Sequence, residues 1–81
     1  MYFIYILSSF KTDRYYVGCT NNINQRLKKH NKGYVRSTKS YRPWKLVYQE
    51  EFNTLSVARK REKQIKSWKS RYNIEKLMGK N

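Results

Sequence analysis

Residues 2–7 read YFIYIL, and every residue in this segment is apolar or aromatic. A run of this length and composition favours a strand that is covered on both faces. After a polar turn at residues 8–14, the sequence YYVGC at residues 15–19 returns to strand composition. Two such runs separated by a short loop are expected to pair as an antiparallel hairpin. That pairing would bring Tyr5 and Tyr16 close together.

Gly18 interrupts the second of these segments. A glycine inside a strand marks either a bulge or the close approach of another part of the chain, or it simply ends the strand. The residue types around Gly18 do not separate these interpretations.

A helix is expected after the hairpin, because Asn21 or Asn22 can cap its start and Gly33 can end it. Gln25 follows Asn22 by three residues, as in a capping box. The helix therefore has both a start signal and a stop signal.

The side chains of this helix are expected to divide by position. Ile23 and Leu27 mark the inner face, and Arg26 and His30, four residues apart, share one side that adjoins it. Residues 34–43 then lack an apolar period and carry several cations, which predicts an exposed loop that contacts phosphate.

The remaining sequence predicts a third strand and two helices. Residues 44–52 alternate in character, with Leu46 and Tyr48 expected on one face and Val47 on the other. From Thr54 onward the pattern changes to a helical period. The apolar stripe of that helix consists of Leu55, Ala58, Ile65 and Trp68. A short final helix is expected at residues 72–78, with a buried side made of Ile74, Leu77 and Met78.

Glu62 occupies the missing position of the apolar stripe. A carboxylate drawn toward the sheet is costly unless it is paired, so cations or a metal ion are expected beside it. The other charged residues of the helix are expected on its outer face. These residues are Arg59, Lys60, Arg61, Lys63 and Lys66.

Length and composition limit the organisation of the chain. With 81 residues there is room for one domain, residues 1–81, and one modest core. The single cysteine, Cys19, excludes an intramolecular disulfide and agrees with a reducing cytoplasm. The apolar run at the start, about six residues, is too short for a signal peptide or a membrane span. A monomer that does not bind membranes is expected.

The charge points to nucleic acid as the partner. The chain carries 19 Lys and Arg against 5 Asp and Glu, a formal net charge of +14, and residues 15–49 hold no carboxylate. Solubility alone needs a much smaller excess of one sign. Cations that neutralise phosphates release condensed counterions, which gives affinity without base reading. The residues predicted to contact the substrate are Gly18, Lys28, Lys29, Arg36 and Lys66.

Five polar residues could act together on a phosphodiester bond: Tyr5, Tyr16, Arg26, His30 and Glu62. Hydrolysis needs a proton acceptor for the attacking water, positive charge near the phosphoryl oxygens and help for the departing alkoxide. A lone carboxylate can hold one Mg²⁺ ion whose other ligands are water and phosphate. The set therefore contains groups for all three tasks.

The motifs FIYIL, YYVGCT and NINQRLKKHN, with an AxxxE pattern in a basic helix, resemble the GIY-YIG nuclease family over most of the chain. The segments RPWKLVYQEEF and ARKREKQIKSW resemble small stand-alone members related to the nuclease domain of bacterial excision-repair (UvrC-like) proteins. The resemblance implies an α+β fold, a three-stranded antiparallel sheet flanked by helices. It also implies a metal-dependent endonuclease that acts on DNA in preference to RNA, with repair or recombination as its setting.

The resemblance also implies a role for each site residue. Tyr5 and Tyr16 would be the tyrosines of the two motifs, and one of their hydroxyls would accept or relay the proton of the attacking water. Arg26 would clamp the scissile phosphate, and His30 would assist proton transfer. Glu62 would bind the single Mg²⁺ or Mn²⁺ ion.

Departures from the family pattern leave alternatives open. Phe3 stands where the first motif has glycine, and Asn73 is only a poorly aligned counterpart of the asparagine that many larger members place after the glutamate. Glu62 could instead be a buried ion-pair partner of Arg26, with no metal. Without a metal, the chain could be a non-catalytic DNA- or RNA-binding module. A ribosome-associated protein is one form of that alternative. Separately, the chain could act together with a protein partner.

Overall fold

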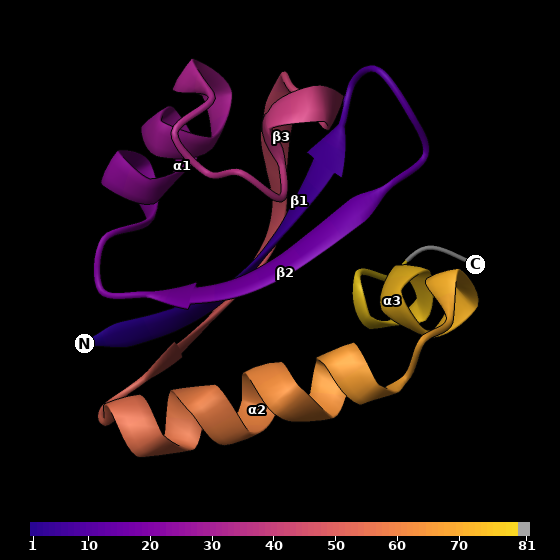
Figure 1. Ribbon diagram of the computed structural model, residues 1–81. Coiled ribbons are helices and arrows are strands. Elements are labelled where there is room, and N and C mark those ends of the chain that lie inside the picture. Colours follow the sequence, from indigo (N-terminus) through magenta and orange to yellow (C-terminus); the bar gives the residue numbers. More distant parts are fainter. Residues whose placement is uncertain (80–81) are drawn as a thin grey trace.

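A three-stranded antiparallel sheet forms the centre of the computed structural model, which describes residues 1–79 (Figure 1). The central strand is β1 (Tyr2–Ser9), with β2 (Tyr15–Thr20) on one side and β3 (Trp44–Phe52) on the other. The predicted strands, hairpin and α+β fold are therefore confirmed.

The side chains of β1 alternate between the two faces of the sheet, as the strand period requires. Ile4 and Ile6 are fully buried on one face, which we call the isoleucine face. Tyr5 and Leu7 are buried on the other, the tyrosine face. Burial on both faces explains why this strand has no polar residue between Tyr2 and Leu7.

Helices cover both faces of the sheet (Figure 1). The helix α1 (Ile23–Lys32) and the short 3₁₀ helix η1 (Lys39–Tyr41) pack on the tyrosine face. The helices α2 (Leu55–Ser67) and α3 (Arg71–Leu77) pack on the isoleucine face. No helix within residues 1–79 has both the length and the apolar character needed to cross a membrane.

The ends of α1 follow the predicted signals, and Asn22 is the residue that caps its start. The Asn22 side chain accepts a hydrogen bond from the Gln25 backbone N–H at 3.1 Å. At the other end Gly33 adopts the left-handed conformation, φ 82°, and its N–H bonds to the carbonyl of His30 at 3.2 Å. A side chain would strain that conformation, which is why glycine ends the helix.

The predicted facing of β3 is wrong at Tyr48, because a bulge breaks the alternation. Ile6 pairs with Tyr48 but Leu7 pairs with Leu46, so one extra residue, Val47, lies between the two pairs. An inserted residue reverses the facing of everything beyond it. Leu46 therefore packs on the tyrosine face, whereas Val47 and Tyr48 both pack on the isoleucine face.

The sequence predicted an exposed loop at residues 34–43, and this prediction is wrong at Thr38. Thr38 is buried, with 1% of its surface exposed. The indole N–H of Trp44 donates to the Thr38 carbonyl at 2.9 Å. The side chain of Asn31 ties α1 to the Trp44 backbone through two further hydrogen bonds, of 2.6 and 3.0 Å. Polar contacts of this kind leave no apolar period, so the pattern did not indicate them.

The helix α2 follows its predicted stripe in part. Thr54 caps its start, and Ala58 and Ile65 are fully buried against the sheet. Leu55 is 38% exposed and so lies at the margin of the core. The final helix α3 begins at Arg71, one residue earlier than predicted, and its apolar residues are only partly buried.

Candidate active site

A polar cavity of about 270 Å³ lies at the outer edge of β2, where α1 and α2 approach each other from opposite faces of the sheet. β2 is an edge strand, so no further strand closes this side. The residues that line the cavity are Tyr5, Tyr16, Gly18, Cys19, Arg26, Leu55, Arg59 and Glu62. Four of the five residues predicted for catalysis and metal binding therefore meet in one place.

Gly18 allows the hydroxyl of Tyr5 to reach this cavity. The two residues pair directly across β1 and β2. A side chain at Gly18 would collide with the Tyr5 hydroxyl, because an added Cβ would overlap the end of the phenol ring. The pairing runs on in register to Thr20, so the interpretations as a bulge or a strand terminator are wrong. Gly18 marks a close approach.

His30 lies behind Tyr5 and does not line the cavity, since it is fully buried. Its Nε2 is 3.0 Å from the Tyr5 hydroxyl, and its Nδ1 is 2.7 Å from the hydroxyl of Thr38. The Thr38 hydroxyl donates its one proton to the Val35 carbonyl at 3.3 Å, so it accepts from His30. The network therefore assigns the proton of neutral His30 to Nδ1, and Nε2 accepts from Tyr5.

Both members of this pair are uncharged at neutral pH. Burial lowers the pKa of His30 to about 4, and the nearby charge of Arg26 adds to the fall. Burial raises the pKa of Tyr5 well above its ordinary value, with a further rise from Tyr16 and an opposing effect of Arg26. Desolvation disfavours the charged form of each group. Tyr5 is therefore a hydroxyl that can pass a proton on, and not a phenolate.

Tyr16 is held in an aromatic cluster beside this pair. Its ring centroid lies 6.2 Å from that of Tyr5, 4.9 Å from His30 and 6.4 Å from Trp44. These are distances at which tilted and edge-on aromatic pairs attract each other. The expected proximity of Tyr5 and Tyr16 is confirmed.

Glu62 enters the cavity from α2, and its partner is Lys66. The Lys66 amine lies 2.8 Å from the Glu62 carboxylate, one helical turn away. The alternative of an ion pair with Arg26 is therefore not the contact that forms. Half of the Lys66 side chain is exposed, so this pair contributes little to stability.

Two residues of α2 that the sequence analysis placed elsewhere also face the cavity. Arg59 was predicted on the outer face and Leu55 in the core, but both line the site with Glu62. Positions 55, 59 and 62 are spaced by four and three residues and so lie on one side of a helix. That spacing was present in the sequence and marks a second stripe, which is turned toward the edge of β2.

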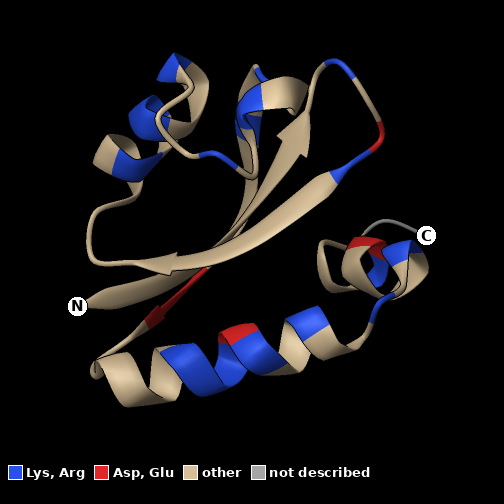
Figure 2. Ribbon diagram, in the orientation of Figure 1, with Lys and Arg blue, Asp and Glu red and all other residues tan. Residues whose placement is uncertain are grey.

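The predicted substrate-binding cations lie at different distances from the site. Figure 2 shows lysines and arginines along α1 and α2, on both sides of the strands β1 and β2, which carry no charged residue. Lys29 lines a smaller hollow of about 160 Å³ that shares Arg26 with the active-site cavity. Lys66 lies beside Glu62, 5.9 Å from the Tyr16 ring centroid. Lys28 and Arg36 are exposed and line neither hollow.

The donor set of the cavity is compatible with a single hard cation. No group of three or more His, Cys, Asp or Glu side chains that could hold a metal ion occurs within residues 1–79. Mg²⁺ does not need one, because it binds through one or two carboxylates and keeps water and substrate oxygens as its other ligands. Glu62 can supply that carboxylate. Asn73 cannot assist, since it lies in α3 and lines a different hollow.

The fold and the cavity together define a class of protein. The site has the GIY-YIG arrangement. The edge strand carries a tyrosine and a glycine, the neighbouring strand carries a second tyrosine, α1 carries an arginine and α2 carries a glutamate. Residues 1–76 match the model of the GIY-YIG catalytic domain, and the chain belongs to this family.

Similar proteins agree with this assignment. A UPF0213 protein of Staphylococcus aureus is 41% identical over 68 residues, which cover 83% of this chain and 82% of the relative. A UPF0213 protein of Staphylococcus saprophyticus is 44% identical over the same shares. The solution NMR structure of the UPF0213 protein BH0048 from Bacillus halodurans covers 98% of this chain and 84% of its own, with a TM-score of 0.60 and 30% identity. The resemblance inferred from the motifs is confirmed.

Proposed function

We propose that the protein is a metal-dependent endonuclease that hydrolyses DNA phosphodiester bonds, in repair or recombination within the cytoplasm. The observation that carries the proposal is the meeting of Tyr5, Tyr16, Arg26 and Glu62 in one cavity rimmed by cations. Membership of the GIY-YIG family supports nuclease chemistry as the class of activity. The net charge of +14 supports a polyanion as the substrate.

The first step follows from the Tyr5 and His30 pair. A water positioned next to Tyr5 gives a proton to the phenol oxygen as it attacks phosphorus, and the phenol proton moves to Nε2 of His30 over 3.0 Å. Tyr5 remains neutral throughout, which suits a hydroxyl whose pKa is raised by burial. His30 holds this proton only transiently, because burial and Arg26 lower its pKa to about 4, and the proton returns through Tyr5 to the departing oxygen.

Two other residues act on the phosphate. Arg26 lines the cavity from α1 and presents a guanidinium to the phosphoryl oxygens, where charge increases in the transition state. The Tyr16 hydroxyl donates to the same group. Glu62 would hold one Mg²⁺ or Mn²⁺ ion, which when bound supplies Lewis-acid stabilisation to the phosphoryl and departing oxygens.

A cleavage assay with matched variants tests the proposal. Linear, nicked and branched DNA would be incubated with Mg²⁺ and with wild-type protein, Glu62→Gln or Tyr5→Phe. Each variant has a control with the same chemical change at an exposed position outside the cavity, Glu51→Gln and Tyr34→Phe. The expected result is a loss of at least about a hundredfold in rate for the site variants only.

Circular dichroism would establish that each variant is folded before its rate is compared. Equal cleavage by all five proteins would refute the assignment of the site. No cleavage of any substrate by the wild-type protein, together with salt-dependent DNA binding that ignores Mg²⁺, would favour the non-catalytic binding module.

A further inference from the structure

A second hollow lies on the other side of Tyr16, between the start of β2 and the corner that joins α2 to α3. We call it the corner pocket. Its volume is about 380 Å³, within the range of roughly 300 to 1,000 Å³ that is typical of small-molecule sites.

The corner pocket combines an apolar interior with a charged rim. Val17, Ile65 and Ile74 belong to the hydrophobic core or pack against it, and they form the floor. Tyr15 also lines the pocket, and the Arg71 guanidinium lies over its ring, 5.1 Å from the ring centroid. The rim carries the cations Arg14, Lys66, Lys69 and Arg71. A ligand that fits both parts has a flat apolar body and an anionic group beside it.

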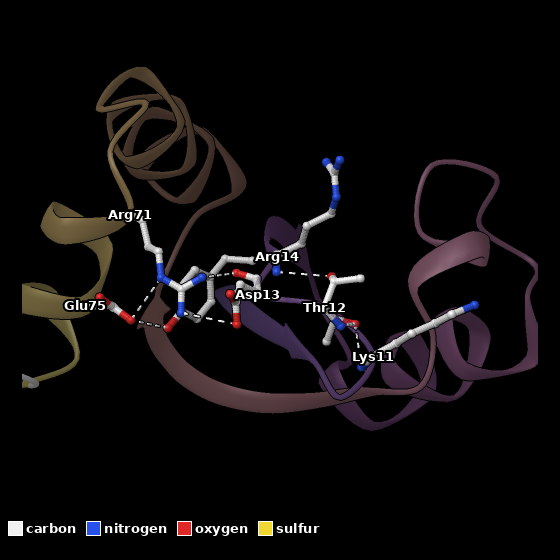
Figure 3. Close-up of polar contacts among 8 residues, drawn as sticks. Lys11, Thr12, Asp13, Arg14, Arg71 and Glu75 are labelled. Atoms are coloured by element: carbon white, nitrogen blue, oxygen red, sulfur yellow. Dashed lines mark hydrogen bonds and ion pairs between the residues drawn. The ribbon is translucent and has the colours of Figure 1, made fainter.

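The walls of the corner pocket are joined to each other, so it is formed before any ligand binds. Figure 3 shows the Arg71 guanidinium between Asp13 and Glu75, which links α3 to the loop before β2. The Tyr15 hydroxyl donates to Glu75 at 2.9 Å. These contacts use most of the charge of Arg71. Lys66 is paired with Glu62, so Lys69 is the rim cation that remains to meet an anion.

Lys69 is held at the mouth of this pocket by the backbone. It follows the end of α2 and is the residue other than glycine, within residues 1–79, that has a positive φ, at 50°. No ion pair joins its amine to a carboxylate in the part of the chain that the structure describes. An unpaired cation at this turn is available for phosphate.

The corner pocket lies next to the active-site cavity. Tyr16 lines both hollows. Lys66 lines the corner pocket while its amine contacts Glu62 and lies 5.9 Å from the Tyr16 ring centroid. One aromatic ring and one lysine therefore separate the two. Adjacent hollows of this kind can take neighbouring groups of one nucleotide chain, a phosphate in one and a base in the other.

We propose that the corner pocket holds one unpaired nucleobase next to the scissile phosphate, so that the substrates are nucleic acids with an unpaired nucleotide at the cut. This inference rests on the proposed nuclease function. A base that is stacked and paired within a duplex cannot enter a side pocket without leaving the stack, which has an energetic cost that an unpaired base does not incur. Stacking on tyrosine accepts any base, so the pocket reads the absence of pairing and not the sequence.

The test measures binding with the chelator EDTA present, so that hydrolysis does not interfere. Fluorescence anisotropy would give the dissociation constants for a blunt duplex, for the same duplex with a short single-stranded extension, and for that extension with abasic nucleotides. All three are compared at one salt concentration, and the complete and abasic extensions carry equal numbers of phosphates. We expect the abasic extension to bind about tenfold more weakly than the complete one, the usual effect of losing one base stack.

Variants locate the effect in the corner pocket. Ile74→Glu places a carboxylate on its floor and should remove the preference for a base. Lys69→Asn removes the rim charge while keeping a residue that tolerates the positive φ, and should weaken the extended DNA more than the blunt duplex. Lys63→Asn makes the same change on an exposed part of α2 that does not line the pocket, and should affect both DNAs equally.

The outcomes separate this inference from the nuclease proposal. Equal affinity of wild-type protein for complete and abasic extensions would overturn the base pocket, even if cleavage is observed. A base preference that is lost in Ile74→Glu would support it, even if no cleavage is observed. A dimer in sedimentation analysis that Ile74→Glu dissociates would show the pocket to be a contact between copies of the chain, and would also overturn it.

Discussion

Thr38→Val tests the proton path directly, because it removes the hydroxyl that accepts from Nδ1 of His30 while nearly preserving shape. The hydroxyl lies 2.7 Å from Nδ1, and both side chains are buried. One neutral hydrogen bond has a net value of about 1 to 1.5 kcal/mol. Its loss shifts the balance between the two His30 tautomers by about fivefold to tenfold. Only the tautomer with a free Nε2 can accept the Tyr5 proton.

We therefore expect kcat/KM to fall in Thr38→Val by at most about tenfold, with DNA affinity unchanged. Thr38→Ser retains the hydroxyl and should restore most of the rate, which separates positioning of His30 from a general loss of packing. A buried N–H without an acceptor should also lower the free energy of unfolding by about 1 to 3 kcal/mol. Thermal melts of both variants would measure that cost.

The tautomer can be observed without any activity. His30 is the one histidine of the chain, so its two ring nitrogens give unambiguous signals in a ¹⁵N-edited NMR spectrum. The wild-type protein should show a protonated Nδ1 and an unprotonated Nε2, and Thr38→Val should show a mixture. A wild-type ring protonated at Nε2, or a Thr38→Val protein with unchanged tautomer and rate, would refute the reasoning.

Three other changes have defined outcomes. Gly18→Ala should lower the free energy of unfolding by about 1 to 3 kcal/mol and displace the Tyr5 hydroxyl, which would be seen as a lower melting temperature and a loss of cleavage. An unchanged melting temperature would mean that Tyr5 does not cross Gly18. Mg²⁺ at ten times its dissociation constant should stabilise the wild-type protein by about 1.4 kcal/mol, several degrees in a thermal melt, and Glu62→Gln but not Glu51→Gln should abolish this rise. The pKa of His30 is lowered in the folded protein to about 4, so the unfolded chain takes up a proton at a higher pH than the folded protein does. The free energy of unfolding should therefore fall as pH drops from about 6.5 toward 4, by roughly 3 kcal/mol in all. Urea unfolding across this range would measure the slope, and a flat profile above pH 4.5 would contradict the burial of a neutral histidine.

Local signals in the sequence predicted most of the secondary structure. The apolar run of β1, the cap at Asn22 and the glycine at Gly33 act through neighbouring residues, so their effects can be derived without knowing the fold. The pairing of β1 with β2 followed from a short loop, and it brought Tyr5 and Tyr16 together as expected. These features required no contact between distant segments.

The errors involve contacts between different structural elements. The bulge at Val47 depends on how β3 meets β1, and it reversed the predicted facing of Tyr48. Thr38 is buried because His30, from another element, supplies a polar partner for its hydroxyl. Arg59 faces the cavity because α2 crosses the edge of β2, and a helical period alone does not identify which of two neighbouring stripes will meet that edge.

Because Tyr5 crosses over Gly18, its hydroxyl reaches the cavity from the central strand β1 and does not depend on the position of the edge strand β2. β2 has a hydrogen-bonded neighbour on one side only, so its amides should exchange with solvent sooner than those of β1, which is bonded on both sides. The Tyr5 hydroxyl belongs to β1 and extends across β2. In the proposed mechanism, fraying of the outer strand can therefore widen the entrance for a nucleic-acid chain while the Tyr5 hydroxyl keeps its place.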